Sequence, residues 1–236
     1  MKYRKIVQTV KGVQTIDGAG VRLTRIIGGL EINTLDPFLL LDEFGSDDPD
    51  DYSGGFPPHP HRGFETISYI LNGKWHHKDS AGNEGLLEDG SVQWMTAGKG
   101  IIHSEMPIQK NGFSRGFQLW LNLPKRLKMT EPNYQDIPKE KIPIIDIPEG
   151  TVKIISGNFN GITGPGKSHT GFLYCDIHLK PETSLNFEVP NGWNCFSYIY
   201  EGSLEKAEYG SKGRLQVYEQ IGDIKLKSGK AGLQAI

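Results

Sequence analysis

The chain has 236 residues and a formal net charge of −2, with 26 Lys and Arg residues against 28 Asp and Glu residues. This balance provides no basic surface for nucleic acid or for an acidic membrane. The N-terminus lacks the apolar stretch of a signal peptide, and no run of 18 apolar residues follows it, so we expect a cytoplasmic protein. The two cysteines, Cys175 and Cys195, fit no close-spaced metal motif and are expected to be reduced.

Short strands joined by turns are expected through most of the chain. The 30 Gly and 14 Pro residues make up about a fifth of it, against an average of roughly 12%. Residues 64–71 are rich in β-branched and aromatic side chains and end at Asn72-Gly73, which is typical of a hairpin. Residues 117–123 alternate in polarity, so their odd positions should face a core. Because only residues 124–128 carry a helix signal, the sequence predicts an all-β fold.

Two pairs of candidate metal ligands lie in the first half of the chain. His59 and His61 form one pair, and His103 and Glu105 form the other. Residues two apart on a β-strand point to the same face, so each pair would direct both side chains into one space. Three imidazoles and a carboxylate that converge in a β-barrel make a site for a divalent transition metal and leave coordination positions for a ligand. This donor set suits Fe(II), and Mn, Ni, Cu and Zn are the alternatives.

Glu65 competes with Glu105 for the role of carboxylate ligand. It follows His61 by four residues and would share its direction on a continuous strand. One of the two glutamates can bind the metal while the other orients an imidazole from behind, and we favour Glu105 as the ligand. Arg62, next to a ligand, could attract an anionic substrate or support the site from behind the ligands, but a surface salt bridge is the role we favour.

The other histidines are expected to have structural roles. His76 and His77 are neighbours in an extended segment, so at least one of them should face solvent. His169 lies in a Gly-rich loop, and His178 is expected to pack on a strand of the second half.

An internal repeat divides the chain. Residues 68–73 (SYILNG) match residues 197–202 (SYIYEG) at an offset of 129, and residues 97–99 match residues 228–230 at an offset of 131. The nearly constant offset indicates duplication of one β-domain. None of the first-half ligand histidines has a histidine at the matching position, so we expect metal binding in the first half alone.

The prolines between the repeats predict a connecting segment, because Pro removes ladder donors and fixes φ. We therefore expect an N-terminal barrel with the metal site over residues 1–125, a Pro-rich linker over residues 126–150 and a C-terminal barrel over residues 151–236. The chain ends at residues 231–236, inside an expected strand, so the second barrel is expected to be incomplete and to have an open strand edge.

Three stretches of the sequence resemble the pirin family. They are residues 35–44 (LDPFLLLDEF), residues 55–66 (GFPPHPHRGFET) and residues 93–107 (QWMTAGKGIIHSEMP), and the likeness extends over nearly the whole chain. The resemblance implies two tandem cupin barrels, which are double-stranded β-helix or jelly-roll domains. It also implies one metal ion, usually iron, held by four residues: His59, His61, His103 and Glu105.

The resemblance implies two classes of function. Bacterial pirins resemble quercetin 2,3-dioxygenases, which open flavonols with O₂ and release CO, so Glu105 would accept a proton from a small aromatic substrate. Phe56, Trp94 and Phe117 are the candidate pocket aromatics. The alternative is an iron-binding, redox-responsive regulator that acts on protein partners, as a transcriptional co-regulator or on a metabolic enzyme. We favour the dioxygenase and expect no direct binding to nucleic acid or membrane.

Overall fold

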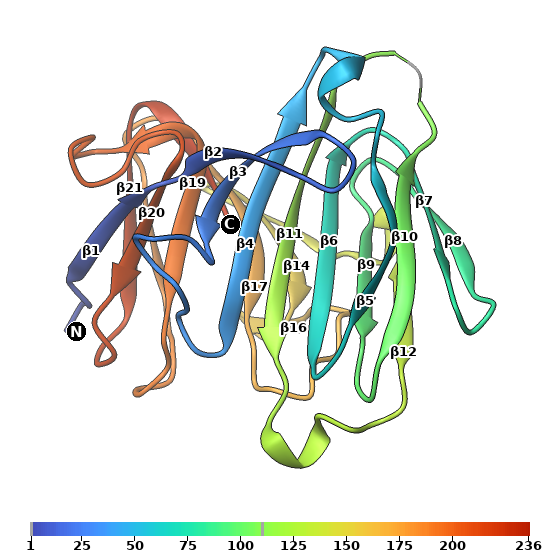
Figure 1. Cartoon of the computed structure of the whole chain (residues 1–236). Coiled ribbons are helices and arrows are strands. Elements are labelled where there is room, and N and C mark those ends of the chain that lie inside the picture. Colours follow the sequence, from blue (N-terminus) through green and yellow to red (C-terminus); the bar gives the residue numbers. More distant parts are fainter. Residues whose placement is uncertain (1, 110) are drawn as a thin grey trace. The chain divides into compact units, whose positions relative to one another are not determined.

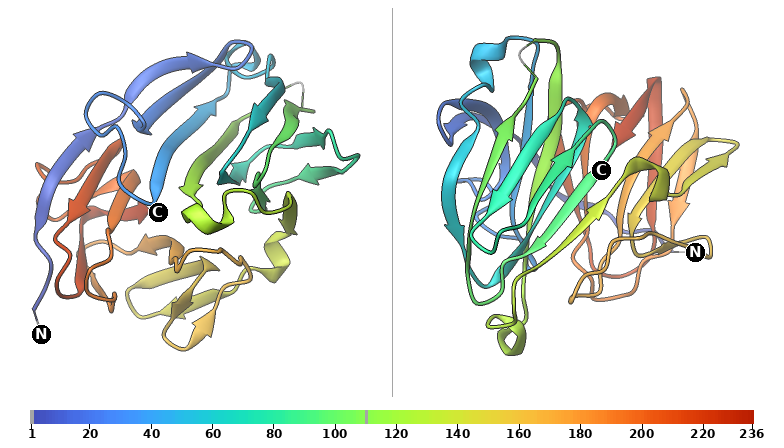
Figure 2. Two further views of the ribbon diagram at one scale, coloured as in Figure 1. Left: turned by 60° about the horizontal axis from the view of Figure 1, so that its bottom comes forward. Right: turned by 90° about the vertical axis from the view of Figure 1, so that its right-hand side faces the viewer.

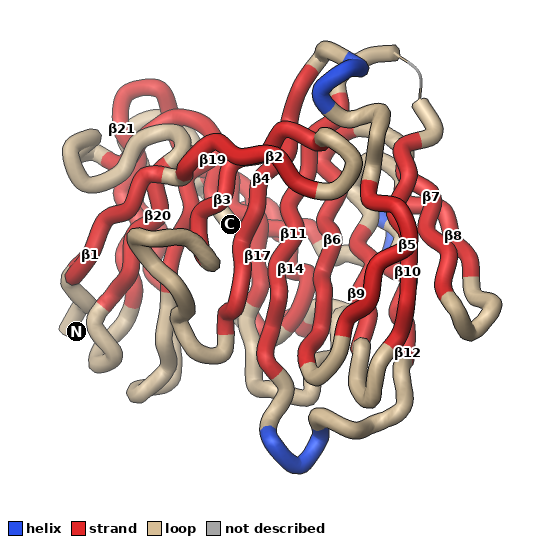
Figure 3. The backbone as a smooth tube through the Cα atoms, in the orientation of Figure 1, coloured by secondary structure: helices blue, strands red, loops and turns tan. Residues whose placement is uncertain are grey.

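Strands make up most of the regular structure in the computed structural model, which describes residues 2–109 and 111–236 (Figure 1, Figure 3). The helices in these residues are short 3-10 turns: η1 (Pro49–Asp51), η2 (Lys125–Leu127) and η3 (Lys139–Lys141). No helix in the described residues has the length and apolarity needed to cross a membrane. The predicted all-β class is confirmed, and η2 lies where the sequence carries a helix signal.

The chain forms two units, each with its own core. The N-terminal unit consists of Val13–Lys141 with Ser168–Thr170, and the C-terminal unit consists of the chain up to Gly12, Ile142–Lys167 and Gly171–Ile236. All strand pairs within the two units are antiparallel.

The N-terminal unit is built from two sheets. The strands of the larger sheet lie in the order β12 (Asn133–Ile137), β9 (Val92–Thr96), β6 (Phe64–Asn72), β11 (Ser114–Asn122), β4 (Phe38–Ser46), β3 (Val21–Ile27) and β2 (Val13–Asp17). Those of the smaller sheet lie in the order β5 (Phe56–His61), β10 (Ile101–Pro107), β7 (Trp75–Asp79) and β8 (Glu84–Leu87). One buried apolar cluster includes Phe44 and Ile70 from the larger sheet and Trp75 and Leu87 from the smaller one. The two sheets therefore pack face to face.

Alternation along β11 distinguishes the two faces of the larger sheet. Phe117, Leu119 and Leu121 are at most 1% exposed, which confirms that the odd positions face a core. Gln118 and Trp120 point the other way, toward the cavity between the two sheets. We call this second face of the larger sheet the inner face.

The C-terminal unit contains one large sheet and a short hairpin. The large sheet has the order β1 (Ile6–Lys11), β20 (Arg214–Tyr218), β19 (Phe196–Leu204), β21 (Ile224–Ala235), β17 (Tyr174–Leu179), β14 (Gly150–Ser156) and β13 (Ile144–Ile147), and β18 (Ser184–Phe187) pairs with β21. The hairpin pairs β15 (Asn158–Phe159) with β16 (Ile162–Thr163). Figure 2 shows β1, at the blue end of the colour scale, beside the red C-terminal strands. Within the described residues, β21 is paired on both sides and does not form the open edge expected from the sequence.

The units differ from the predicted boundaries in two places. The first strand of the chain, β1, belongs to the C-terminal unit because it pairs with β20. The predicted linker over residues 126–150 contains β12, which completes the larger N-terminal sheet, and β13, which pairs with β14. The prolines fall between these strands, so they are compatible with sheet pairing on either side.

Two local predictions are wrong. Asn72-Gly73 does form a turn, with Gly73 at φ 110°, but it leads from β6 in the larger sheet to β7 in the smaller one and closes no hairpin. In the repeat, residues 97–99 lie at a turn after β9, whereas residues 228–230 lie inside β21. The SYILNG and SYIYEG segments do occupy comparable long strands, β6 and β19.

Candidate metal centre

The smaller sheet brings the first pair of histidines beside the second. β5 pairs with β10 so that His59 lies directly opposite His103. β5 is an edge strand of its sheet, which explains how it accommodates Pro57, Pro58 and Pro60: an edge strand leaves half of its backbone donors unpaired. The prolines on both sides of His59 thus keep the strand extended while His59 and His61 point to one side.

The three imidazoles form a compact cluster. Their ring centroids lie 4.7 Å apart for His59 and His61, 4.5 Å for His59 and His103, and 4.8 Å for His61 and His103. One ligating atom from each ring lies within 4.8 Å of the others. Nε2 of His61 and both ring nitrogens of His103 are buried and have no hydrogen-bond partner among the described residues. Buried polar atoms without a partner are costly, and a metal ion held by these nitrogens would satisfy them.

The protonation states favour metal binding. Burial, together with the nearby His103 and His59, lowers the pKa of His61 to about 3, and Glu105 only partly opposes this effect. Burial also lowers the pKa of His103. Both rings are therefore neutral at pH 7, so their lone pairs are available without displacement of a proton.

Glu105 lies next to the cluster and is fixed by two hydrogen bonds. Ser68 Oγ donates to its Oε1 at 2.8 Å, and Gln118 Nε2 donates to its Oε2 at 2.9 Å. Burial opposes ionisation of this carboxyl, but His103 and the two hydrogen bonds outweigh it, so the pKa of Glu105 is lowered. The structure thus places an ionised carboxylate beside the neutral rings of His61 and His103.

The side chain of Glu65 lies on the face of β6 that points away from the histidine cluster. β5 ends at His61 and β6 begins at Phe64 in a different sheet, with Gly63 at φ 81° between them, so the strand that would carry Glu65 toward the histidines is interrupted. Glu65 is opposite Leu121, on the face away from the cavity. Its carboxylate accepts hydrogen bonds from Thr96 at 2.8 Å and Ser168 at 2.9 Å.

A cavity of about 550 Å³ opens on the histidine cluster. Its size lies within the range of roughly 300–1,000 Å³ that is typical of small-molecule sites. His59, His61 and Glu105 contribute to its lining, and its aromatic lining consists of Phe44, Phe56, Phe64, Trp75 and Trp120.

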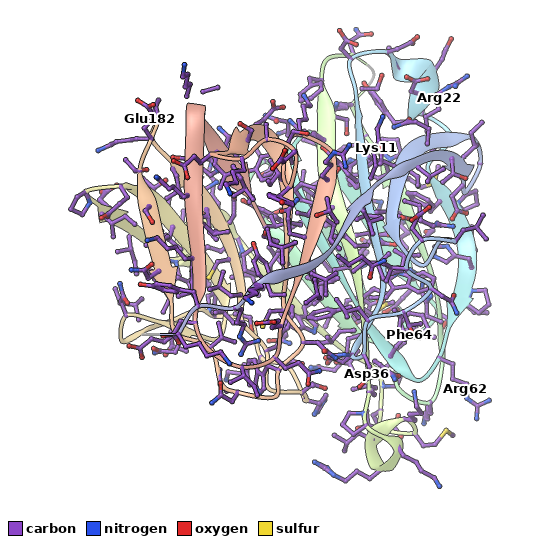
Figure 4. All side chains as sticks on the ribbon, turned by 90° about the vertical axis from the view of Figure 1, so that its left-hand side faces the viewer. Lys11, Arg22, Asp36, Arg62, Phe64 and Glu182 are labelled. Atoms are coloured by element: carbon purple, nitrogen blue, oxygen red, sulfur yellow. The ribbon has the colours of Figure 1, made fainter. Side chains whose placement is uncertain are left out.

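The sequence predicted the cavity lining only in part. Phe56 lines the cavity as expected, but Trp94 and Phe117 are fully buried and lie outside its lining. Arg62 contributes to the lining but is exposed, and Figure 4 shows its side chain projecting away from the ribbon. Its guanidinium contacts Met129 Sδ at 3.3 Å.

The remaining histidines lie outside the cluster. His76 is 34% exposed and His77 is 1% exposed, which confirms that one of this pair faces solvent. His169 is exposed. In the C-terminal unit, His178 Nε2 lies 3.0 Å from Asp176 Oδ1 and 2.8 Å from the hydroxyl of Tyr200, which agrees with a packing role.

Several functional candidates were missed by sequence reasoning. Ser68 and Gln118, which bind Glu105, alternate with apolar residues and look like the solvent-facing positions of half-buried strands. The sequence does not show that a second sheet will cover a polar side chain at such a position. Their role becomes visible only when β5 and β10 are placed over the inner face.

Comparison with known proteins gives a consistent result. Residues 20–121 match the family model for pirin. A pirin-like protein of Caulobacter vibrioides is 50% identical over 210 residues, which cover 88% of this chain and 76% of that protein. A Pseudomonas aeruginosa protein, provisionally named a quercetin 2,3-dioxygenase, is 43% identical over 100% of this chain and 86% of its own length.

Solved structures show the same architecture. The crystal structure of a quercetin 2,3-dioxygenase from Acinetobacter baumannii matches with a TM-score of 0.90 and 27% identity, over 99% of this chain and 85% of that chain. The tandem cupin fold expected from the sequence is thereby confirmed.

Proposed function

The chain belongs to the pirin family, and we propose that it is a metal-dependent dioxygenase that opens flavonols such as quercetin with O₂ and releases CO. The observation that carries this proposal is the cluster of three imidazoles beside an ionised carboxylate, with His59, His61 and Glu105 in the lining of an aromatic cavity. The names of the Pseudomonas and Acinetobacter proteins support the same activity.

In this proposal the metal is Fe(II), and four residues hold it: His59, His61, His103 and Glu105. The buried nitrogens of His61 and His103 fit such an ion, because no described residue forms a hydrogen bond with them. When bound, the metal would act as a Lewis acid and redox partner toward a deprotonated hydroxyl group and O₂.

The protein itself supplies a shaped cavity and a proton acceptor. The rings of Phe64 and Trp120 pack together with centroids 4.7 Å apart and form an apolar wall suited to a planar aromatic molecule. Glu105 is ionised at neutral pH, so its carboxylate can accept the proton of the substrate hydroxyl. The hydrogen bonds from Ser68 and Gln118 keep that carboxylate in one orientation while it does so.

The test is single-turnover production of CO. Protein loaded anaerobically with Fe(II) is mixed with quercetin and then with O₂, and CO is measured against quercetin consumed. We expect CO in proportion to the quercetin consumed from the native chain and a loss of at least about a hundredfold in the rate for His61→Ala. Absence of CO from fully loaded protein, or equal release from the variant, would contradict the proposal.

A further inference from the structure

An ion-paired trio of residues lies in the same cavity as the histidine cluster. Arg25 on β3 donates from Nε to Asp42 Oδ1 at 3.0 Å and from Nη2 to Asp42 Oδ2 at 2.8 Å. The same Nη2 donates to Asp17 Oδ2 at 2.7 Å. Asp17, Arg25 and Asp42 all contribute to the cavity lining. They lie on the inner face, because Arg25 is opposite Asp42, which shares that face with Gln118.

The turn between β2 and β3 brings Asp17 close to the strand that carries the histidines. Ala19 N donates to Gly55 O at 2.9 Å. A Cβ on Gly18 would lie 2.5 Å from Gly55 O and 2.6 Å from Phe56 Cδ1, and Gly18 has a φ of 56°. Only glycine allows this close approach. The turn is therefore packed against the beginning of β5, three residues before His59.

The two carboxylates of the trio have different surroundings. The side chain of Asp42 is 7% exposed, and its bidentate bonds to Arg25 pair β3 with β4. Asp17 is 51% exposed, and its ion pair with Arg25 is of the partly solvated kind that adds little stability. The presence of Asp42 is thus explained by its contribution to the fold, whereas the ion pair of Asp17 contributes much less to stability.

The trio presents donors and acceptors to the cavity. Nε and Nη2 of Arg25 are engaged with the two aspartates, so its Nη1 retains two N–H groups. The Asp17 carboxylate accepts from Gly18 N and from Arg25 and has further lone pairs. One guanidinium with two carboxylates has a net charge of −1 when all are ionised, which disfavours an anionic ligand. A neutral hydroxyl group can both donate to Asp17 and accept from Arg25.

We propose that Asp17 and Arg25 form a second polar anchor in the cavity, which binds the phenolic hydroxyl groups of a neutral, planar aromatic substrate whose other end reaches the histidine cluster. This inference rests on the proposed function and makes it more specific: the preferred flavonols carry hydroxyl groups on the ring remote from the metal. Binding of these groups requires both partners of the exposed pair, and it does not require Asp42 to contact the substrate.

Equilibrium binding tests this anchor without turnover. Protein loaded anaerobically with Fe(II) is titrated calorimetrically with quercetin and with galangin, which has the same ring system without the two hydroxyl groups on the remote ring. We expect the native chain to bind quercetin about tenfold more tightly, as a pair of charge-assisted hydrogen bonds allows. Asp17→Ala should remove this preference and leave galangin binding unchanged.

Asp51→Ala is the matched control. Asp51 pairs with Arg22 at 2.9 Å, and Arg22 is on the same strand as Arg25 but outside the cavity lining; Figure 4 labels it at the edge of the molecule. This variant should keep the native preference for quercetin. Asp17→Asn retains the shape of the turn and tests the charge of the carboxylate alone. This variant should weaken quercetin binding severalfold.

The outcomes separate this inference from the proposed function. An equal loss of both ligands in Asp17→Ala, or no loss of either, would overturn the anchor. Binding of neither flavonol by the native chain would overturn it together with the proposed substrate class. Selective, Asp17-dependent binding of quercetin without CO release on addition of O₂ would support the anchor and contradict only the dioxygenase activity.

Discussion

Gln118 on β11 donates a 2.9 Å hydrogen bond to Glu105 on β10 and so links the two sheets of the N-terminal unit beside the histidines. The same amide group donates to Ser68 Oγ at 3.1 Å, and Ser68 in turn donates to Glu105. Gln118 Oε1 accepts from Trp120 at 3.3 Å. The orientation of the Glu105 carboxylate is therefore determined by residues of the opposite sheet.

Replacing Gln118 should weaken metal binding although Gln118 is not itself a metal ligand. Gln118→Leu removes one of the two hydrogen bonds that orient Glu105, and losses of this kind typically cost roughly 10-fold to 100-fold in metal affinity. Competition with a fluorescent chelator measures the effect. Gln93→Leu is the control, because Gln93 is a buried glutamine of the same sheet that bonds to Asp136 instead. Equal affinities for the two variants would contradict this role of Gln118.

The two glutamates should respond differently to the same substitution. Glu105→Gln removes the charge beside the imidazoles, and we expect at least about a tenfold loss of Fe(II) affinity. Glu65→Gln changes a carboxylate that binds Thr96 and Ser168, so it should lower the melting temperature and leave metal affinity within about twofold. Isothermal titration and thermal unfolding of the metal-free variants distinguish the two effects. The reverse order of affinities would assign the ligand role to Glu65.

The sequence predicted the histidine cluster because the relevant rule is local. Two residues two apart on one strand share a face whatever the strand pairs with, and this holds for His59 with His61. Glu65 shows where the same rule stops. Its parity relative to His61 is meaningful only on a continuous strand, and the break at Gly63 transfers the chain to another sheet. The preference for Glu105 over Glu65 as the carboxylate ligand, which the family resemblance supports, stays a prediction.

Other features of the fold depend on which strands pair and which sheets pack together, and no local sequence pattern shows this. The polar positions of β11 look solvent-facing in the sequence, yet Gln118 is covered by the smaller sheet. Asn72-Gly73 carries the chemistry of a hairpin turn but connects two sheets. β1 lies at the start of the chain and pairs with β20, about two hundred residues later, so the linear division into domains could not place it.

The turn that approaches β5 should tolerate no side chain at Gly54. An added Cβ would overlap the carbonyl oxygen of Ala19, and the neighbouring backbone cannot move without disturbing the bond from Ala19 to Gly55. We expect Gly54→Ala to destabilise the protein by about 1–3 kcal/mol, as overpacking typically does. At Gly29 the nearest atom would be Arg25 Cγ at 3.9 Å, so Gly29→Ala should change stability by less than about 0.5 kcal/mol.

Urea unfolding of both variants measures this difference. A Gly54→Ala variant as stable as Gly29→Ala would show that the turn is free to shift away from β5, and the position argued for Asp17 would then be wrong.

Asp176 should make the stability of the C-terminal unit dependent on acid pH. Burial opposes its ionisation, but His178, Lys153 and Tyr200 outweigh this effect and lower the pKa of Asp176 to about 2. The unfolded chain binds this proton more tightly, so the stabilisation is complete above pH 3.8 and is lost as the pH falls toward 2. The expected size is about 2 kcal/mol, from 1.36 kcal/mol per pKa unit.

Denaturant unfolding of the metal-free protein between pH 2 and pH 6 tests this expectation. Asp176→Asn should be less stable than the native chain at pH 6, and the difference should shrink toward pH 2. Asp146→Asn, at an exposed position of the same unit, should show no such trend. A difference for Asp176→Asn that is constant with pH would contradict the assigned ionisation.

The most direct test of the account is the iron content of purified protein after anaerobic loading with Fe(II) and removal of free metal. We expect one iron per native chain and less than about a tenth of that in His61→Ala and in His103→Ala. His76→Ala and His178→Ala, which change histidines outside the cluster, should retain a full equivalent. A full equivalent of iron in either cluster variant, with the fold intact, would show that the metal is held elsewhere.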